Sequence, residues 1–391
     1  MTSTAAPPTE KQDLNGLRAC NVCGQEKREW NPFQPCRTLH VRRCLFDDIQ
    51  LRSGGRAGKR FPQLVALLVC SLAVVAHGQS FGCPDADTLR PCACDMDGIS
   101  CEKANSTQDL RRAFNSTGLK EHRGLWIVRT SVGSFPEDVL GDFVFAEIHL
   151  NFNSNLTSFS IDSLNNSRPF LRNINLYGNA LSTFEFHRIN QFPKLTVLNL
   201  GKNRLDTIPN WAFSNPQLKK LILAGNPIRS LGVRAFAALP KLEMLNLEGT
   251  RITNLGDFAL TLYSSYPKLT VNLKESNVFN ISKLAFANSS PFSLTLTRNN
   301  LTTFPQDVFG PLLTSMRNHA LRTNNSIVLD VTGNPFTCRG CSFGWLLSRK
   351  YDPVFQHVLH GFRCADRRTL MDLTMSRIQC LPGRPAAGRV N

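Results

Sequence analysis

A repeated leucine pattern constrains the fold of this chain more than any other feature of its sequence. Its clearest copies begin at Leu171, Leu195, Leu218 and Leu242, and each follows the form Leu-x-x-(Leu/Ile)-x-Leu-x-x-(Asn/Thr)-x-(Leu/Ile). The polar residue of the unit, here named the ladder residue, recurs at intervals of 23 to 26 residues, with one interval of 35 before the last, at Thr130, Asn153, Asn179, Asn203, Asn226, Thr250, Ser276, Asn299 and Asn334. A unit this short cannot bury its apolar face alone, so the copies must stack on one another.

The residues of the unit predict an α/β-type solenoid with a parallel sheet on its concave side and an irregular convex side. The x-Leu-x-Leu-x segment predicts a short strand with inward leucines, and the ladder residue gives buried backbone groups a hydrogen-bonding partner. We expect about eight repeats over residues 121–333. Phenylalanines recur in the convex half of the unit, and we expect these and the other phenylalanines of the chain to form core: Phe213, Phe236, Phe258, Phe286 and Phe309.

Cysteines flank the repeats on both sides. One group precedes them and a second follows them: Cys83, Cys92, Cys94 and Cys101, then Cys338, Cys341, Cys364 and Cys380. The end of a solenoid exposes an apolar edge, so a disulfide-stapled cap is expected over residues 79–120 and again over 334–380. Zinc is the competing use of these cysteines, and spacing alone leaves three possible disulfide pairings in each group.

A secretory signal peptide is predicted over residues 61–78. Arg56, Lys59 and Arg60 precede an apolar run over residues 64–76, which is shorter than the ~20 residues that span a bilayer, and Ala76 to Gly78 form a small-residue cleavage site. Residues 1–60 then read as an upstream extension outside the mature protein. A zinc site is the alternative for four cysteines in that segment, Cys20, Cys23, Cys36 and Cys44.

Glycosylation signals also indicate an extracellular protein. The pattern Asn-x-Ser/Thr occurs only after the predicted signal peptide, at Asn105, Asn115, Asn155, Asn165, Asn280, Asn288, Asn300 and Asn324. The tail over residues 381–391 has no apolar span and no lipid-anchor signal, which argues against a membrane-tethered receptor.

The caps and repeats together resemble the cysteine-flanked extracellular leucine-rich repeat proteins. The resemblance lies in Cys83-Pro84, in the Pro-Cys-x-Cys that ends at Cys94, and in the Asn-Pro-Phe-x-Cys that ends at Cys338. It implies that the first cysteine of each cap pairs with the third and the second with the fourth: Cys83 with Cys94, Cys92 with Cys101, Cys338 with Cys364, and Cys341 with Cys380. The chain also resembles secreted arthropod members of the family, including the non-catalytic subunit of decapod luciferases.

The outward-facing strand residues of the concave face are the candidate binding surface. A middle row is expected at Trp126, His149, Asn175, Asn199, Ile222, Asn246, Asn272, Thr295 and Asp330, with Tyr177, Glu248, Lys274 and Thr297 beside it. Its asparagines could supply adaptable donors and acceptors. The alternative is that any such sheet needs small polar residues there, because a fold does not specify a function.

Charge offers a second surface. The chain has 45 Lys and Arg against 29 Asp and Glu, a net +16, and an excess falls in the C-terminal cap and tail, where Arg363, Arg367 and Arg368 lie close in sequence. A compact basic surface would attract acidic glycans, and solubility is the alternative explanation.

No catalytic motif accompanies these features. The sequence contains no His-Glu-x-x-His, no Gly-x-Ser-x-Gly and no phosphate-binding glycine loop. We therefore expect a non-enzymatic extracellular scaffold, without cofactor or metal, that binds a protein through its concave face. The alternatives are a matrix or acidic-glycan binder that uses the basic cap, and a non-catalytic, stabilising subunit of a secreted oxygenase. Nucleic acid is not an expected partner.

Overall fold

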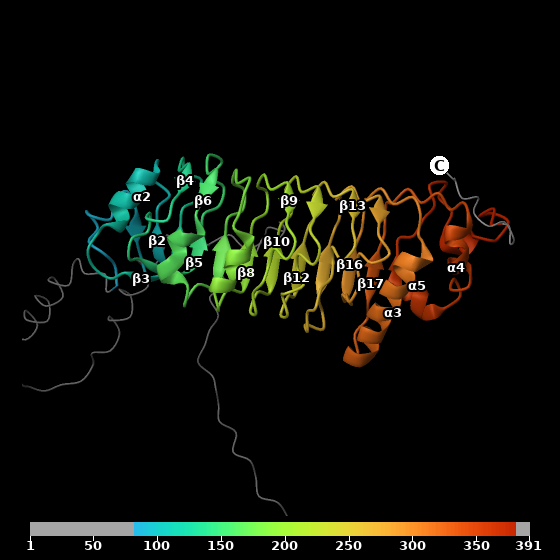
Figure 1. Ribbon diagram of the computed structural model, residues 1–391. Helices are drawn as coiled ribbons and strands as arrows, with labels where there is room; N and C mark the ends of the chain where they lie inside the picture. The colour runs from blue at the N-terminus through green and yellow to red at the C-terminus, as the bar shows by residue number, and fades with distance from the viewer. Residues whose placement is uncertain (1–81, 381–391) are drawn as a thin grey trace, which may run out of the picture. The chain divides into compact units, whose positions relative to one another are not determined.

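The computed structural model describes residues 82–380, which form one continuous stack of strands (Figure 1). The predicted upstream extension, signal peptide and C-terminal tail lie outside the described residues. A 12-stranded sheet runs through the stack in the order β1-β2-β3-β5-β7-β8-β10-β12-β14-β16-β17-β18. All neighbours in it are parallel except the first pair, β1 and β2. The expected solenoid with a parallel sheet is therefore confirmed.

The strands of this sheet are short, as the three-residue x-Leu-x core of the repeat requires. Their bounds are β1 Ala93–Cys94, β2 Gly98–Ser100, β3 Glu121–Trp126, β5 Val144–His149, β7 Asn173–Asn175, β8 Val197–Asn199, β10 Lys220–Ile222, β12 Met244–Asn246, β14 Thr270–Asn272, β16 Ser293–Thr295, β17 Val328–Asp330 and β18 Leu359–His360.

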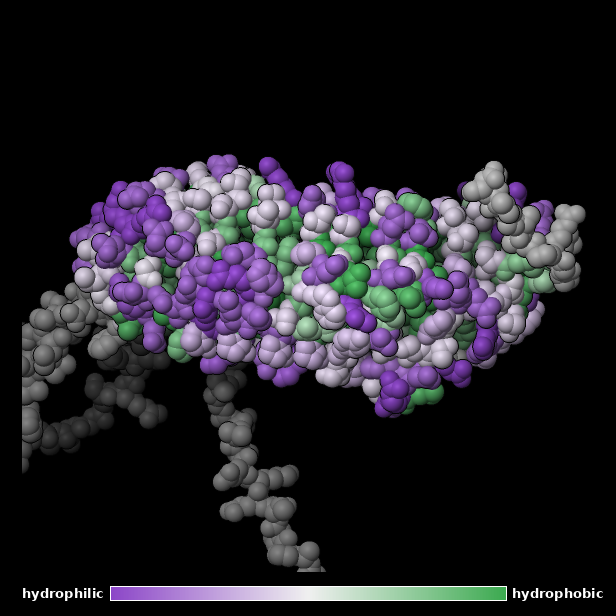
Figure 2. Space-filling model, in the orientation of Figure 1, coloured by the Kyte–Doolittle hydropathy of each residue, from purple (hydrophilic) through white to green (hydrophobic). Residues whose placement is uncertain are grey.

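The opposite, convex side holds two-residue strands and short helices. The strand pairs are β4 Ser134–Phe135 with β6 Ser158–Phe159, β9 Thr207–Ile208 with β11 Ser230–Leu231, and β13 Asn254–Leu255 with β15 Asn280–Ile281. Two 3-10 helices, η1 Ile161–Ser167 and η2 Phe186–Gln191, lie between them along the chain. Figure 2 shows hydrophilic side chains gathered over the part labelled α2, β5 and β8 in Figure 1, and more hydrophobic surface toward α3.

The ladder residues join neighbouring repeats, and all nine of them are buried. Asn203 Nδ2 donates to the carbonyls of Leu176 and Leu200 at 2.9 and 3.0 Å, and its Oδ1 accepts from the backbone N–H of Leu181 at 3.1 Å. Thr250 differs, because its hydroxyl donates within its own repeat, to the Leu247 carbonyl at 3.0 Å. The Thr250 side chain therefore forms no hydrogen bond to a neighbouring repeat of the described stack.

The phenylalanine prediction is correct in part. Phe213 and Phe236 are buried and stack at 5.6 Å between ring centroids. Phe258 is wrong as a core residue: it is only partly buried with a positive φ of 58°, and Leu260, two residues later, fills the core position. The general expectation also fails for Phe152, Phe170 and Phe279, which are exposed.

Disulfides staple both ends of the described stack. They link Cys83 to Cys94, Cys92 to Cys101, Cys338 to Cys364, and Cys341 to Cys380, which are the pairs that the resemblance implies. The N-terminal cap also contains α2, Thr107–Phe114, which a capping box at Ser106 begins. The C-terminal cap contains η3 Cys341–Phe343, α4 Gly344–Leu347, α5 Pro353–Val358 and η4 Leu370–Asp372.

The long interval before the last ladder residue is a helix, α3, Gln306–Thr323. Its first three turns bury Val308, Phe309, Leu312, Leu313 and Met316, and its far end extends away from the stack (Figure 1). Near that end, His319 Nε2 lies 2.9 Å from the carbonyl oxygen of Pro267, which precedes β14. The sequence predicted an insertion here but not its structure.

Candidate functional site

The predicted middle row of the concave face is a true register row of the sheet. Each of its members is the last residue of its strand, and each pairs with the next across neighbouring strands. The row runs through Trp126, His149, Asn175, Asn199, Ile222, Asn246, Asn272, Thr295 and Asp330, all partly exposed. The structure extends it to Ser100 at one end and His360 at the other.

The asparagines of this row are fixed in orientation. The backbone N–H two residues later donates to the side-chain oxygen of Asn175 at 3.1 Å and of Asn199 at 3.0 Å, and the same bond forms at Asn246 and Asn272. A flipped amide would place its NH2 group against that N–H, so the oxygen must face the backbone. The hydrogen bonds therefore fix which end of each amide faces the backbone, and the NH2 group is the end turned away from it.

Trp126 lies over Gly124 and beside His149. A Cβ on Gly124 would stand 2.3 Å from Cη2 of the Trp126 ring, so only glycine leaves room for the indole. The Trp126 and His149 rings are parallel within 2° at 5.6 Å between centroids. Burial lowers the pKa of His149, and its hydrogen bond to Glu147 opposes that shift only in part. His149 is accordingly neutral at pH 7.

A second aromatic pair continues the face toward the middle of the stack. Phe152 and Tyr177 meet edge to face at 5.3 Å between centroids. The Arg129 guanidinium lies 5.5 Å from the centre of the Phe152 ring, and the Lys202 ammonium lies 5.6 Å from that of Tyr177. Among the described residues, neither cation has a carboxylate within ion-pair distance. We name this region, from β3 to β8, the aromatic half.

From β12 to β16 the same face carries a closed network of charges, here named the charged half. Lys274 Nζ lies 2.9 Å from a Glu248 oxygen, Arg298 lies 2.9 Å from Glu275, and Asn272 Nδ2 donates to Glu248 at 3.1 Å. Glu248 raises the pKa of Lys274, and the Arg298 guanidinium lowers the pKa of Glu275. Each of these charges has its counter-charge within the protein.

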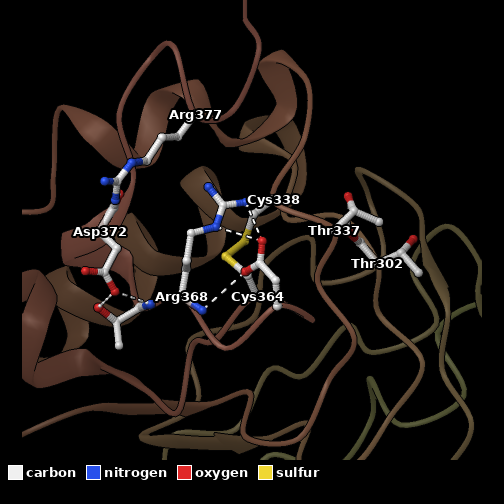
Figure 3. The surroundings of a disulfide bond; sticks show 9 residues. Thr302, Thr337, Cys338, Cys364, Arg368, Asp372 and Arg377 are labelled. Atoms are coloured by element: carbon white, nitrogen blue, oxygen red, sulfur yellow. Dashed lines mark hydrogen bonds and ion pairs between the residues drawn. A yellow bond between two sulfur atoms is a disulfide. The ribbon is translucent and has the colours of Figure 1, made fainter.

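The basic residues of the C-terminal cap are partly used by the cap itself. Figure 3 shows Arg368 beside the Cys338–Cys364 disulfide, where it forms an ion pair with Asp366 at 2.7 Å. Arg377 donates to the Asp372 carbonyl at 2.9 Å. Arg363 and Arg367 are exposed. The three arginines proposed from sequence are thus unequal, because Arg368 is already paired.

Comparison with known proteins agrees with this architecture. A family model described as leucine rich repeat matches residues 193–252, the stretch with the most regular copies of the unit. The chain contains leucine-rich repeats.

The leucine-rich repeat chain is also similar to the Oplophorus-luciferin 2-monooxygenase non-catalytic subunit of Oplophorus gracilirostris. The two are 28% identical over 134 residues, which is 32% of this chain. The match spans 37% of the length of that relative.

Solved structures resemble the leucine-rich repeat chain at low sequence identity. A chain of the octameric complex of Latrophilin 3, Unc5D and FLRT2 is 18% identical with a TM-score of 0.45, and the match covers 76% of this chain and 100% of that one. A chain of the TLR13–ssRNA13 complex is 17% identical with a TM-score of 0.44, over 70% of this chain and 42% of that one.

All eight predicted glycosylation asparagines are exposed, and none belongs to the concave row. Asn280 lies in the convex strand β15, Asn165 lies in η1, and Asn324 caps the far end of α3. The predicted glycan attachment positions therefore lie outside the concave row.

Two kinds of feature are absent from the described part of this leucine-rich repeat chain. Residues 82–380 contain no helix long and apolar enough to cross a membrane. The same residues contain no group of three or more His, Cys, Asp or Glu side chains placed to hold a metal ion.

Sequence reasoning missed Arg129, Phe152 and Lys202. Each directly precedes a ladder residue and has a positive φ, whereas Gly178 and Gly225 occupy the same position in other repeats. A residue other than glycine at such a position can indicate a role for its side chain. A left-handed backbone is strained for residues with a Cβ, so the side chain there is expected to make a compensating contact. Aligning the residue before each ladder residue would have found all three.

Proposed function

We propose that this leucine-rich repeat chain is a secreted, N-glycosylated scaffold that binds another protein through its concave face. The observation that carries the proposal is the separation of the two surfaces: eight exposed sequon asparagines lie off the sheet face, and an unbroken row of partly exposed side chains lies on it. Four disulfides in the described residues support an oxidising compartment. A face free of bulky sugar can dock a protein.

A glycan placed on the concave face tests the proposal. The double change Ile222→Asn with Ala224→Thr creates a sequon in the middle of the row, and secretion from eukaryotic cells would attach a sugar there. The change Gly256→Thr is the matched control, because it completes a sequon at exposed Asn254 on the convex strand β13 and a Cβ at Gly256 has nothing within 4 Å.

The readout is the set of proteins that co-purify with the secreted chain, identified by mass spectrometry. We expect the concave glycan to remove the partner and the convex glycan to leave it. Retention of the partner by both variants would contradict the proposal. If the concave sequon prevents secretion, Ile222→Arg places a large charged side chain at the same site and gives the same expectation.

A second candidate function is a non-catalytic, stabilising subunit of a secreted oxygenase. The similarity to the Oplophorus non-catalytic subunit favours it. This reading gives the chain no turnover of its own. It predicts that the purified chain leaves coelenterazine unoxidised and lengthens the activity half-life of an added catalytic subunit, and oxidation by the chain alone would contradict both this candidate and the scaffold.

A further inference from the structure

We propose that the aromatic half of the concave face binds an acidic segment of a protein partner. The inference rests on the proposed function and names the chemistry of the ligand. Three independent features of the aromatic half attract the same kind of group, an oxygen that accepts hydrogen bonds or carries negative charge.

The first feature is the fixed amides. Because backbone N–H groups hold the oxygens of Asn175 and Asn199, the NH2 groups of these amides are turned away from the backbone. Neither NH2 group has a hydrogen-bond partner among the described residues, whereas Asn272 donates to Glu248. Adjacent strands of a sheet are about 4.8 Å apart, so these two donors form a closely spaced pair.

The second feature is the aromatic rings, each of which has a neighbour over one face. His149 stacks on Trp126, and Arg129 and Lys202 lie over Phe152 and Tyr177. The rim of an aromatic ring carries positive partial charge, and it therefore attracts acceptor oxygens. The two cations beside the rings add to this attraction, so the arrangement favours a carboxylate over a neutral sugar.

The third feature is charge. Arg129 and Lys202 are exposed, and the described residues provide neither with an ion pair. Glu147, in β5, is held by other partners, His149 at 3.4 Å and Arg123 at 3.9 Å. Two cations among neutral donors suit a peptide with a few carboxylates, whereas a polysulfated chain needs a denser set of cations.

The test uses the full secreted chain and two fluorescent probes measured by anisotropy: a peptide of ten glutamates, and a peptide of ten lysines as the charge control. We expect the glutamate peptide to bind and the lysine peptide not to bind. Affinity should fall as salt is raised, because exposed charges are screened.

Asn199→Asp is the decisive variant. It keeps the side-chain oxygen that accepts from the backbone and replaces the outward donor with a carboxylate, and Asp330 shows that aspartate makes the same backbone bond in this row at 2.9 Å. We expect the glutamate peptide to bind about tenfold more weakly, as like charges meet. Asn272→Asp adds the same charge in the charged half, three strands away, and should change the affinity less than twofold.

Lys202→Ala and Arg129→Ala give the second comparison. Each should weaken binding about three- to fivefold, while Lys274→Ala leaves it unchanged because that ammonium is already paired with Glu248. Equal losses in Lys202→Ala and Lys274→Ala, or no loss in Asn199→Asp, would overturn the inference. So would a heparin fragment that binds more tightly than the peptide and is lost in the same variants, since the ligand would then be a glycan.

Failure of this inference is separable from failure of the proposed function. If the concave glycan removes the partner while Asn199→Asp and Lys202→Ala bind that partner normally, the scaffold function stands and the acidic ligand is overturned. If the concave glycan leaves the partner bound, the scaffold function itself fails.

Discussion

The aromatic half and the charged half of the concave face lie on different strands of the same sheet and differ in how far their charged groups are paired. In the charged half, Lys274 and Arg298 each lie 2.9 Å from a glutamate oxygen. In the aromatic half, Arg129 and Lys202 lie over aromatic rings, and outward amide groups remain without partners among the described residues.

The ladder behind the face has one weak position, Thr250. Asn203 and Asn226 donate across repeats to the Leu176 and Leu200 carbonyls, and the Ser276 hydroxyl donates across a repeat to the Leu247 carbonyl at 2.8 Å. In the described stack, the Thr250 hydroxyl donates only within its own repeat. The side-chain links between repeats are therefore interrupted at the start of the charged half.

The largest expected effect comes from breaking the ladder on each side of the division. Asn203→Ala would leave the buried backbone N–H of Leu181 without a partner. It would also remove one of the two amide donors to each of the Leu176 and Leu200 carbonyls, which keep Asn179 and Asn226. We expect these losses to lower the free energy of unfolding by about 2–4 kcal/mol. Thr250→Val removes one bond within a repeat and should cost about 1 kcal/mol. Urea unfolding followed by circular dichroism measures both, and equal costs would contradict the difference between these two ladder positions.

Gly124→Ala tests the support of the Trp126 ring. The added methyl would overlap the indole, so the ring must leave its place and we expect a loss of about 1–3 kcal/mol together with a shifted tryptophan emission. Gly256→Ala is the control, because the space around that glycine is open. An unchanged emission spectrum in Gly124→Ala would show that the space left by Gly124 does not position the Trp126 indole.

Acid should weaken the aromatic half selectively. Burial lowers the pKa of His149 and of His122 below the ordinary value of 6.5, so the unfolded chain takes up protons before the folded chain does. Stability is unaffected above that value and falls as pH decreases through it. Urea midpoints at pH 7.5 and pH 5 should therefore differ by less in His149→Gln and in His122→Gln than in the parent, and an identical difference would refute the assignment.

The smallest effect sharpens the comparison by repairing the ladder. In Thr250→Asn the new amide would reach the Leu223 carbonyl and the Ile228 N–H, as Asn226 reaches Leu200 and Leu205 one repeat earlier. We expect a gain of about 0.5–1.5 kcal/mol, the net value of a hydrogen bond. A loss of stability would mean that the threonine is packed too tightly for the larger side chain.

Much of the architecture could be predicted because its cause is periodic. Every ladder residue and every member of the concave row follows from the spacing of leucines, since the same backbone geometry recurs in each repeat. Trp126 and Asp330 are placed correctly from the ends of the array even though their repeats are degraded copies.

Features that depend on the path of the backbone could not be predicted in this way. The orientation of Asn199 depends on a hydrogen bond from Gly201, which no residue pattern specifies. Phe258 was assigned to the core because it is a phenylalanine in the convex half of its repeat. The core position of that repeat belongs to Leu260, two residues later. The roles of Arg129 and Lys202 depend on left-handed turns that orient them toward neighbouring rings.

The helix α3 changes how the C-terminal end of the stack can fold. A solenoid has contacts mainly between adjacent repeats, so ordering can begin at any repeat and spread outward in small steps. The contact between His319 and Pro267 joins residues 52 apart in sequence, with β14 and β16 between them along the chain. We expect β14, β16, β17 and α3 to become protected from hydrogen exchange together, as one late cooperative unit, while the repeats before them close one by one.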